Sequence, residues 1–137
     1  MTRPIEFRAW VKDLKEYRKV AAIHYVIVNG LKVSHVELWG RNFADKEITR
    51  SFCDVVLEQF TGLLDRNGKK IHEGDVVGLF YATVPEKCNE KVVIVWDDIH
   101  TGWEGERPGG ERVFLPLGDY TQYEMEVIGN IHEKEEK

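Results

Sequence analysis

Cysteine is scarce in this sequence, because the 137 residues include only Cys53 and Cys88. Two cysteines do not build a disulfide scaffold, and since they form no Cys-x-x-Cys pair they give no support to a structural zinc site. We therefore expect each to be a free thiol that packs as a small hydrophobic group.

Long apolar runs are also missing. No run approaches the roughly 20 residues that a transmembrane helix needs. The opening MTRPIEFRAW lacks the apolar segment of a secretory signal. These absences predict a cytoplasmic protein with no membrane partner.

The sequence shows no internal repeat, no low-complexity tract and no change of composition that would mark a linker. A chain of this length is long enough for a single core and short for two. We predict one β domain over residues 1–132, followed by a disordered charged tail, EKEEK, over residues 133–137.

Catalytic and cofactor motifs are absent as well. The sequence has no His-x-x-x-His pair, no nucleophile elbow and no dinucleotide-binding fingerprint. We accordingly predict no catalytic residue, no metal ligand and no cofactor, and we expect that the protein is not an enzyme.

Charged residues are plentiful but unevenly distributed. The net charge of −5 argues mildly against a generic nucleic-acid binder. The first 50 residues contain 10 Lys and Arg against 6 Asp and Glu, whereas the remainder contains 9 against 18. This asymmetry fits a basic face, a self-complementary assembly, or a solvated surface without a special role.

The hydrophobic pattern is mostly that of β-strands. IEFRAWV, residues 5–11, alternates apolar and polar side chains with period two, which is typical of a half-buried strand. The following KDLKEYRKV also fits a short helical stripe, but we predict a polar turn there. The next segment, VAAIHYVIV at residues 20–28, is predicted to be a strand because it is rich in β-branched and aromatic residues.

Asn29 and Gly30 separate that strand from LKVSHVELW, residues 31–39. Asn-Gly between two such runs predicts a hairpin, since a type I′ turn needs a positive φ at both central residues. Counting outward from the turn places His24 opposite His35. They are either surface or interface histidines, or a cross-strand pair that could share a ligand or respond to pH.

The remaining pattern completes a β protein. Segment 40–51 is predicted to be a loop or a single helical turn, and the Gly- and Pro-rich segment 97–112 a long loop. The predicted fold class is all-β, or β-dominated α+β, with small barrel-like antiparallel sheets and at most short helices. Further strands are predicted at residues 52–63, 76–84, 91–96, 113–117 and 123–131.

FTGLLDRNGKKIHEGDVV, Phe60 to Val77, is dense in turn-forming residues. It lacks the spacing of a phosphate-binding P-loop, and a lysine occupies a position where calcium would need an oxygen ligand. We interpret the stretch as two structural turns: Asp65 accepts backbone N–H groups, and the first turn includes Asn67 and Gly68 while the second includes Gly74 and Asp75.

The same stretch resembles the TGL-D-NG--I-EGD-V core of the YopX-like family of phage and prophage proteins. The opening IEFRAWV and the closing EVIGNIHE resemble the family's two ends, and VIVWDDIHTGW lies where the family has a strand before a variable loop. One departure is Val11, where the family usually has Asp. The resemblance implies a mostly β fold, encoded in phage or prophage genomes of Gram-positive bacteria, without an established activity or catalytic residues.

One acidic group follows the predicted strand at 91–96. Asp97 and Asp98 with His100 and Glu104 could serve acid–base chemistry or metal-assisted hydrolysis. Adjacent residues of a strand point to opposite faces, so Asp97 and Asp98 could cooperate only if the chain turns there. We interpret them as solvated turn residues.

Tryptophans and N-terminal basic residues could together bind a single nucleic-acid strand, because bases stack on aromatic rings beside a basic stripe. The alternative is that the aromatic rings pack in the core and in interfaces. The candidate residues are Arg8, Lys12, Lys15, Trp10 and Trp39, with Arg3, Arg18, Lys19, Tyr25, Trp96 and Trp103 as further members.

With no catalytic motif, the sequence predicts a phage or prophage accessory protein that acts by binding a protein partner or another copy of itself. Exposed edge strands favour self-assembly, because assembly is a common way to cover them. The alternative is a nucleic-acid-binding regulator. The resemblance places either one in the cytoplasm of a bacterial host cell.

Overall fold

The computed structural model describes residues 5–81, 86–114 and 123–133 of the chain. It divides into two compact units, an N-terminal unit over Pro4–Gln59 and a C-terminal unit that begins at Phe60. The expectation of one domain over residues 1–132 stays a prediction. Apart from Glu133, the tail predicted to be disordered lies outside the described residues.

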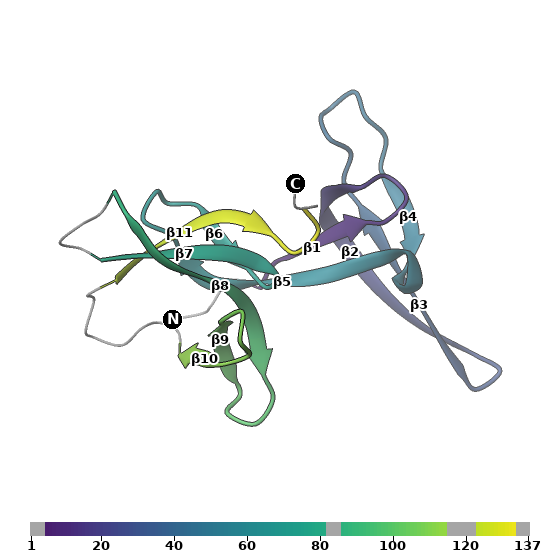
Figure 1. Cartoon of the computed structure of the whole chain (residues 1–137). Helices are drawn as coiled ribbons and strands as arrows, with labels where there is room; N and C mark the ends of the chain where they lie inside the picture. Colours follow the sequence, from purple (N-terminus) through teal and green to yellow (C-terminus); the bar gives the residue numbers. More distant parts are fainter. Residues whose placement is uncertain (1–4, 82–85, 115–122, 134–137) are drawn as a thin grey trace. The chain divides into compact units, whose positions relative to one another are not determined.

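Five strands build the N-terminal unit: β1 (Phe7–Val11), β2 (Glu16–Val28), β3 (Leu31–Leu38), β4 (Ile48–Ser51) and the first half of β5 (Val55–Leu64). They pair antiparallel in the order β4-β3-β2-β1-β5, so β4 is an edge strand. A short 3-10 helix, η1 (Phe52–Asp54), precedes β5. Figure 1 shows β2 and β3 as a long hairpin.

Two turns set the register of this unit. Residues 12–15 form the polar turn between β1 and β2, and the helical alternative does not occur. The turn is shorter than predicted, because residues 16–20 already belong to β2 and pair with β1 and β3. Asn29 and Gly30 have φ of 49° and 79°, which brings His24 opposite His35 as counted from the sequence. Phe52 of η1 packs against the core of this unit, whose buried residues are Ala9, Val11, Val36, Leu38 and Val55.

The C-terminal unit contains the second half of β5, β6 (Lys70–His72), β7 (Asp75–Tyr81), β8 (Cys88–Asp97), β9 (Gly102–Glu106), β10 (Arg112–Phe114) and β11 (Tyr123–Asn130). Five of these strands pair antiparallel in the order β10-β9-β8-β7-β11, while β6 pairs with β5. The buried core residues are Ile71, Val77, Leu79, Val92, Ile94 and Trp103.

The predicted fold class is confirmed, since the chain is 62% strand and 3% helix, and its two antiparallel sheets do not close into a barrel. Among the described residues η1 is the only helical element.

Two segments predicted to be loops contain strands, so those two predictions are wrong. In segment 97–112, β9 forms despite its two glycines because Trp103 packs in the core and Gly105 admits Val92, whose side chain would lie 2.7 Å from an added Cβ. In segment 40–51, β4 forms because it pairs with the core strand β3. Neither cause is local, so the residue pattern of each segment gave no sign of it.

Both cysteines are free thiols, as predicted, but neither is buried. Cys53 is exposed in η1 and Cys88 is half-buried at the start of β8. The expectation that each packs as a buried hydrophobic group is therefore wrong.

Candidate functional site

Asp65 forms the centre of the first turn in the stretch from Phe60 to Val77. Its carboxylate accepts hydrogen bonds from the backbone N–H groups of Asn67 and Lys69, both at 2.8 Å, and of Val127 in β11 at 2.9 Å. Burial raises the pKa of the Asp65 carboxyl, but these three hydrogen bonds outweigh burial and the net pKa lies below its ordinary value. Gly68 has a φ of 82°, and no atom approaches its Cβ position.

The second turn follows the same principle. Gly74 has a φ of 85°, and its N–H donates to the carbonyl of Ile94. The Asp75 carboxylate is buried and accepts a hydrogen bond from the backbone N–H of His72 at 2.7 Å. In both turns the aspartate carboxylate accepts hydrogen bonds from the protein's own backbone. Neither carboxylate is therefore directed at an external ligand.

Arg8 and Trp10, two of the proposed nucleic-acid contacts, have partners inside the N-terminal unit. Arg8 Nε donates to the buried carboxylate of Glu58 at 2.9 Å, and the guanidinium lies over the Tyr17 ring. Tyr17 also donates its hydroxyl to Glu58, at 2.8 Å. Trp10 is half-buried and meets Tyr17 edge to face. This group joins β1, β2 and β5.

Lys12 and Lys15 are both exposed. The ammonium of Lys12 donates to the backbone carbonyl of Cys53, and Lys15 occupies the turn with a φ of 53°. A cavity of about 490 Å³ lies beside Lys12 and is lined also by Asp13, Arg50 and Asp54. Arg50 pairs with Asp13 there at 3.0 Å, so the lining is close to electrically neutral.

The most open apolar surface of the N-terminal unit lies on the loop between β3 and β4. Trp39 is 51% exposed and Phe43 is fully exposed. These two aromatic residues both line a groove of about 480 Å³. The complete lining is Trp39, Gly40, Asn42, Phe43, Asp45 and Glu47. We call these six residues the aromatic groove.

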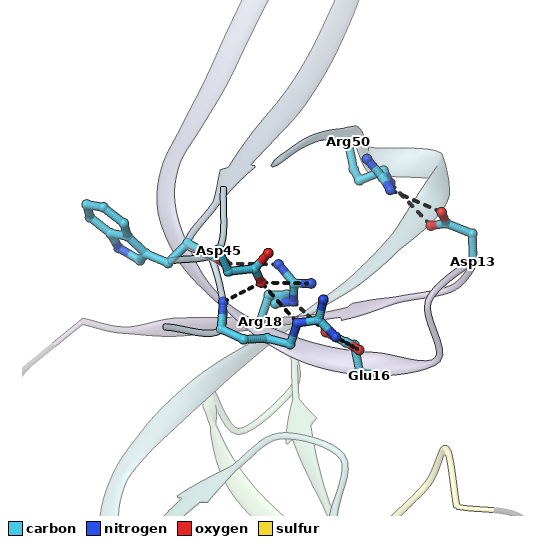
Figure 2. Close-up of polar contacts among 7 residues, drawn as sticks. Asp13, Glu16, Arg18, Asp45 and Arg50 are labelled. Carbon is cyan, nitrogen blue, oxygen red and sulfur yellow. Dashed lines mark hydrogen bonds and ion pairs between the residues drawn. The ribbon is translucent and has the colours of Figure 1, made fainter. Parts of the chain in front are cut away.

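A network of charges holds this loop in place. Arg18 in β2 is buried, and its guanidinium contacts Glu16 at 2.6 Å, Asp45 at 3.6 Å and the carbonyl of Trp39 at 3.3 Å. Figure 2 shows Arg18 between Asp45 and Glu16. Arg41 bonds Asp45 through both its backbone N–H and its Nε, at 2.8 and 2.9 Å.

Close packing and short hydrogen bonds also define the loop. A Cβ on Gly40 would lie 2.3 Å from the carbonyl oxygen of Asp45, so only glycine fits there without a shift of the backbone. The Asn42 side chain accepts a hydrogen bond from the N–H of Ala44 at 2.9 Å. These contacts hold the backbone of the loop that carries the two aromatic residues, so less backbone entropy is lost when the loop binds a partner.

A second cluster lies in the C-terminal unit, where the turn between β8 and β9 brings Asp97, His100 and Glu104 together. His100 Nδ1 is 2.5 Å from Asp97 Oδ2 and 3.9 Å from Glu104 Oε2. Asp98 is exposed and is not part of the cluster. Hydrogen bonding from His100 lowers the pKa of Asp97 far below its ordinary range, and the reciprocal hydrogen bond raises the pKa of His100.

The two histidines of the β2–β3 hairpin stack face to face, with ring centroids 4.5 Å apart. His24 Nε2 also lies 2.7 Å from the Glu37 carboxylate. Both rings therefore contribute to the hairpin's own packing, and a shared ligand or a response to pH stays a prediction.

Four residues that matter for the aromatic groove were missed or misjudged from sequence. Arg18 was counted with a basic stripe, although it is buried and paired. Phe43, Asp45 and Glu47 were assigned no role. The one sequence signal was a large aromatic residue in the otherwise polar GRNFADKE. The tryptophans divide between the two predicted roles: Trp103 is buried, Trp10 half-buried, and Trp39 and Trp96 exposed by 51% and 40%.

The fold and these surfaces define an all-β protein with two antiparallel sheets. Comparison with protein families matches residues 6–137 to the YopX protein family, and the chain belongs to that family. No curated protein matches it. One solved structure that it resembles is protein EF1440 from Enterococcus faecalis, at 21% identity and a TM-score of 0.52, over 96% of this chain and 95% of that one. That likeness concerns the fold alone.

No helix among the described residues is long and apolar enough to cross a membrane.

Proposed function

We propose that the protein is a phage or prophage accessory protein that acts in the cytoplasm of a bacterial host by binding rather than by catalysis, and that a second copy of the chain occupies the aromatic groove. The observation that carries this proposal is the exposure of Phe43 and Trp39 on a loop whose backbone is held by the contacts of Arg18 and Arg41 with Asp45 and with the Trp39 carbonyl. Aromatic residues are enriched in protein interfaces, and tryptophan is among the residues that most often dominate their binding energy.

The groove is self-complementary in shape. Phe43 is fully exposed, and the groove that it lines has a volume of about 480 Å³, which is more than an aromatic ring occupies. A two-fold axis through such a patch places the Phe43 of each copy in the groove of the other, which is how an isologous interface forms.

The groove is also self-complementary in charge. Lys46 and Glu47 are both exposed beside it, and neither forms an ion pair with another of the described residues. Across a two-fold axis, Lys46 of one copy meets Glu47 of the other, twice. The edge strand β4 begins directly after Glu47, so the same contact covers part of an exposed sheet edge.

Sedimentation velocity tests the proposal on the purified protein over a range of protein and salt concentrations. We expect a dimer that dissociates on dilution, and the Phe43→Ala variant should dissociate at a protein concentration at least tenfold higher. Leu14→Ala, which removes another exposed apolar side chain outside the groove, is the matched control and should leave the equilibrium unchanged. A protein that is monomeric at every concentration overturns the proposal.

The second candidate function is single-strand nucleic-acid binding. It is favoured by three exposed lysines, Lys12, Lys15 and Lys19. Of these, Lys19 lies beside Trp39, because its carbonyl accepts the Trp39 N–H. It is weakened because Arg8 and Arg18 are paired with carboxylates. Fluorescence titration with oligonucleotides at low salt tests it. Binding should weaken steeply with salt and be reduced by Lys15→Glu. Absence of binding at low salt ends this alternative.

A further inference from the structure

The turn between β8 and β9 gathers one nitrogen and two oxygen donors at one point. Asp97 ends β8, His100 lies in the turn and Glu104 is in the middle of β9. One donor atom of each lies within 4.8 Å of the others, and no other group of three such side chains occurs in the part of the chain that the structure describes. The pairing of Asp97 with Gly102 and of Val95 with Glu104 puts both carboxylates on the same face of the sheet.

The two carboxylates are buried while the histidine is accessible. The side chains of Asp97 and Glu104 are 10% and 4% exposed, whereas that of His100 is 62% exposed. Two buried carboxylates in one place repel each other and lose hydration, so the arrangement is stabilised by positive charge beside them or by a proton on one of them. Arg112 approaches Glu104 only to 3.5 Å and is itself 41% exposed.

Each carboxylate uses one oxygen for the protein and directs the other toward His100. Asp97 Oδ1 accepts the N–H of Ile99 at 2.9 Å, and Glu104 Oε1 faces Arg112. Asp97 Oδ2 and Glu104 Oε2 are the atoms nearest His100 Nδ1. Outer partners of this kind orient the ligands of protein metal sites.

We propose that Asp97, His100 and Glu104 form a binding site for a divalent transition-metal ion such as Zn²⁺ or Mn²⁺. One imidazole with two carboxylates suits these ions better than Ca²⁺ or Mg²⁺, which prefer all-oxygen shells. Three protein ligands leave at least one coordination position, and the exposed side of the site opens it to water or to a ligand oxygen. The site lies in the C-terminal unit and is independent of the aromatic groove.

Isothermal titration of the chelator-treated full chain with Zn²⁺ or Mn²⁺ tests the site, with thermal melts as a second readout. We expect one ion per chain and a melting temperature that rises with metal concentration. His100→Ala should weaken binding at least tenfold, and a cooperative melt of the metal-free variant checks that it is folded. His132→Ala is the matched control and should bind like the wild type. No saturable binding of either ion, or equal binding by His100→Ala, overturns the proposal.

Discussion

At the scale of the residue, Asp65 shows how one carboxylate can determine a turn. Three backbone N–H groups, including that of Val127 on β11, depend on it as their acceptor. Asp65→Ala leaves these donors without a partner, and we expect a loss of about 2–4 kcal/mol in the free energy of unfolding. Urea denaturation measures it. Asp98→Ala, at an exposed aspartate, should cost less than about 0.5 kcal/mol. If Asp65→Ala and Asp98→Ala lost the same free energy of unfolding, the hydrogen bonds to Asp65 would not stabilise the fold.

The same carboxylate predicts a dependence on pH. The pKa of Asp65 is below 3.8 in the folded protein and near that value when unfolded, so its contribution to stability is present above pH 3.8 and is lost as pH falls through the folded pKa. The difference in unfolding free energy between wild type and Asp65→Asn should therefore narrow below about pH 3.8. Urea denaturation of both proteins from pH 7 to pH 3 measures this difference. A difference that stays constant with pH would contradict a lowered pKa of Asp65 in the folded protein.

Gly40 makes a residue-scale prediction for the aromatic groove. Gly40→Ala forces the backbone of Asp45 away from its present position, and we expect a cost of about 1–3 kcal/mol together with weaker self-association. Gly109→Ala is the control, because nothing lies near its Cβ position. Chemical denaturation and sedimentation measure the two effects. A Gly40→Ala protein as stable as the Gly109→Ala protein would show that the loop is not tightly closed.

At the scale of the element, the β3–β4 loop depends on a side chain of β2. Arg18→Met removes the guanidinium that contacts Glu16, Asp45 and the Trp39 carbonyl, and leaves two partly buried carboxylates close together. We expect a loss of about 2–4 kcal/mol. Lys19→Met, at the exposed neighbouring position, should change stability by less than about 0.5 kcal/mol. Thermal melts compare the two variants, and similar melting temperatures for Arg18→Met and Lys19→Met would contradict the proposed role of Arg18.

The elements that could be predicted are those with local causes. Asn29 and Gly30 favour a tight turn through their own backbone preferences. The alternation of apolar and polar residues in IEFRAWV is visible without knowledge of the strands that pair with it. β9 and β4 depend on packing against distant strands. The pairing of Arg18 with Asp45 joins residues 27 positions apart, so no spacing rule reveals it. For the same reason a basic stripe was inferred in which Arg8 and Arg18 are in fact paired with carboxylates.

At the scale of the whole molecule, the excess of basic residues among the first 50 positions does not produce an equally large positive electrostatic potential. The N-terminal cations Arg8, Arg18, Arg41 and Arg50 each face a carboxylate within the N-terminal unit. These pairs reduce the positive potential that nucleic acid would need. Only those of Arg41 and Arg50, which involve exposed side chains, are of the surface kind that adds little stability. The charges left to select a partner at the aromatic groove are those of Lys46 and Glu47.

A charge exchange at these two positions tests the central claim most directly. In Lys46→Glu and in Glu47→Lys, both ion pairs across the two-fold axis become repulsive, so each variant alone should dimerise at least tenfold more weakly than wild type. Mixing the two variants makes both contacts attractive again. Sedimentation velocity should therefore show two monomeric proteins that form a heterodimer when mixed. If each variant alone dimerises like wild type, or if the mixture stays monomeric, a second copy does not occupy the aromatic groove in this way.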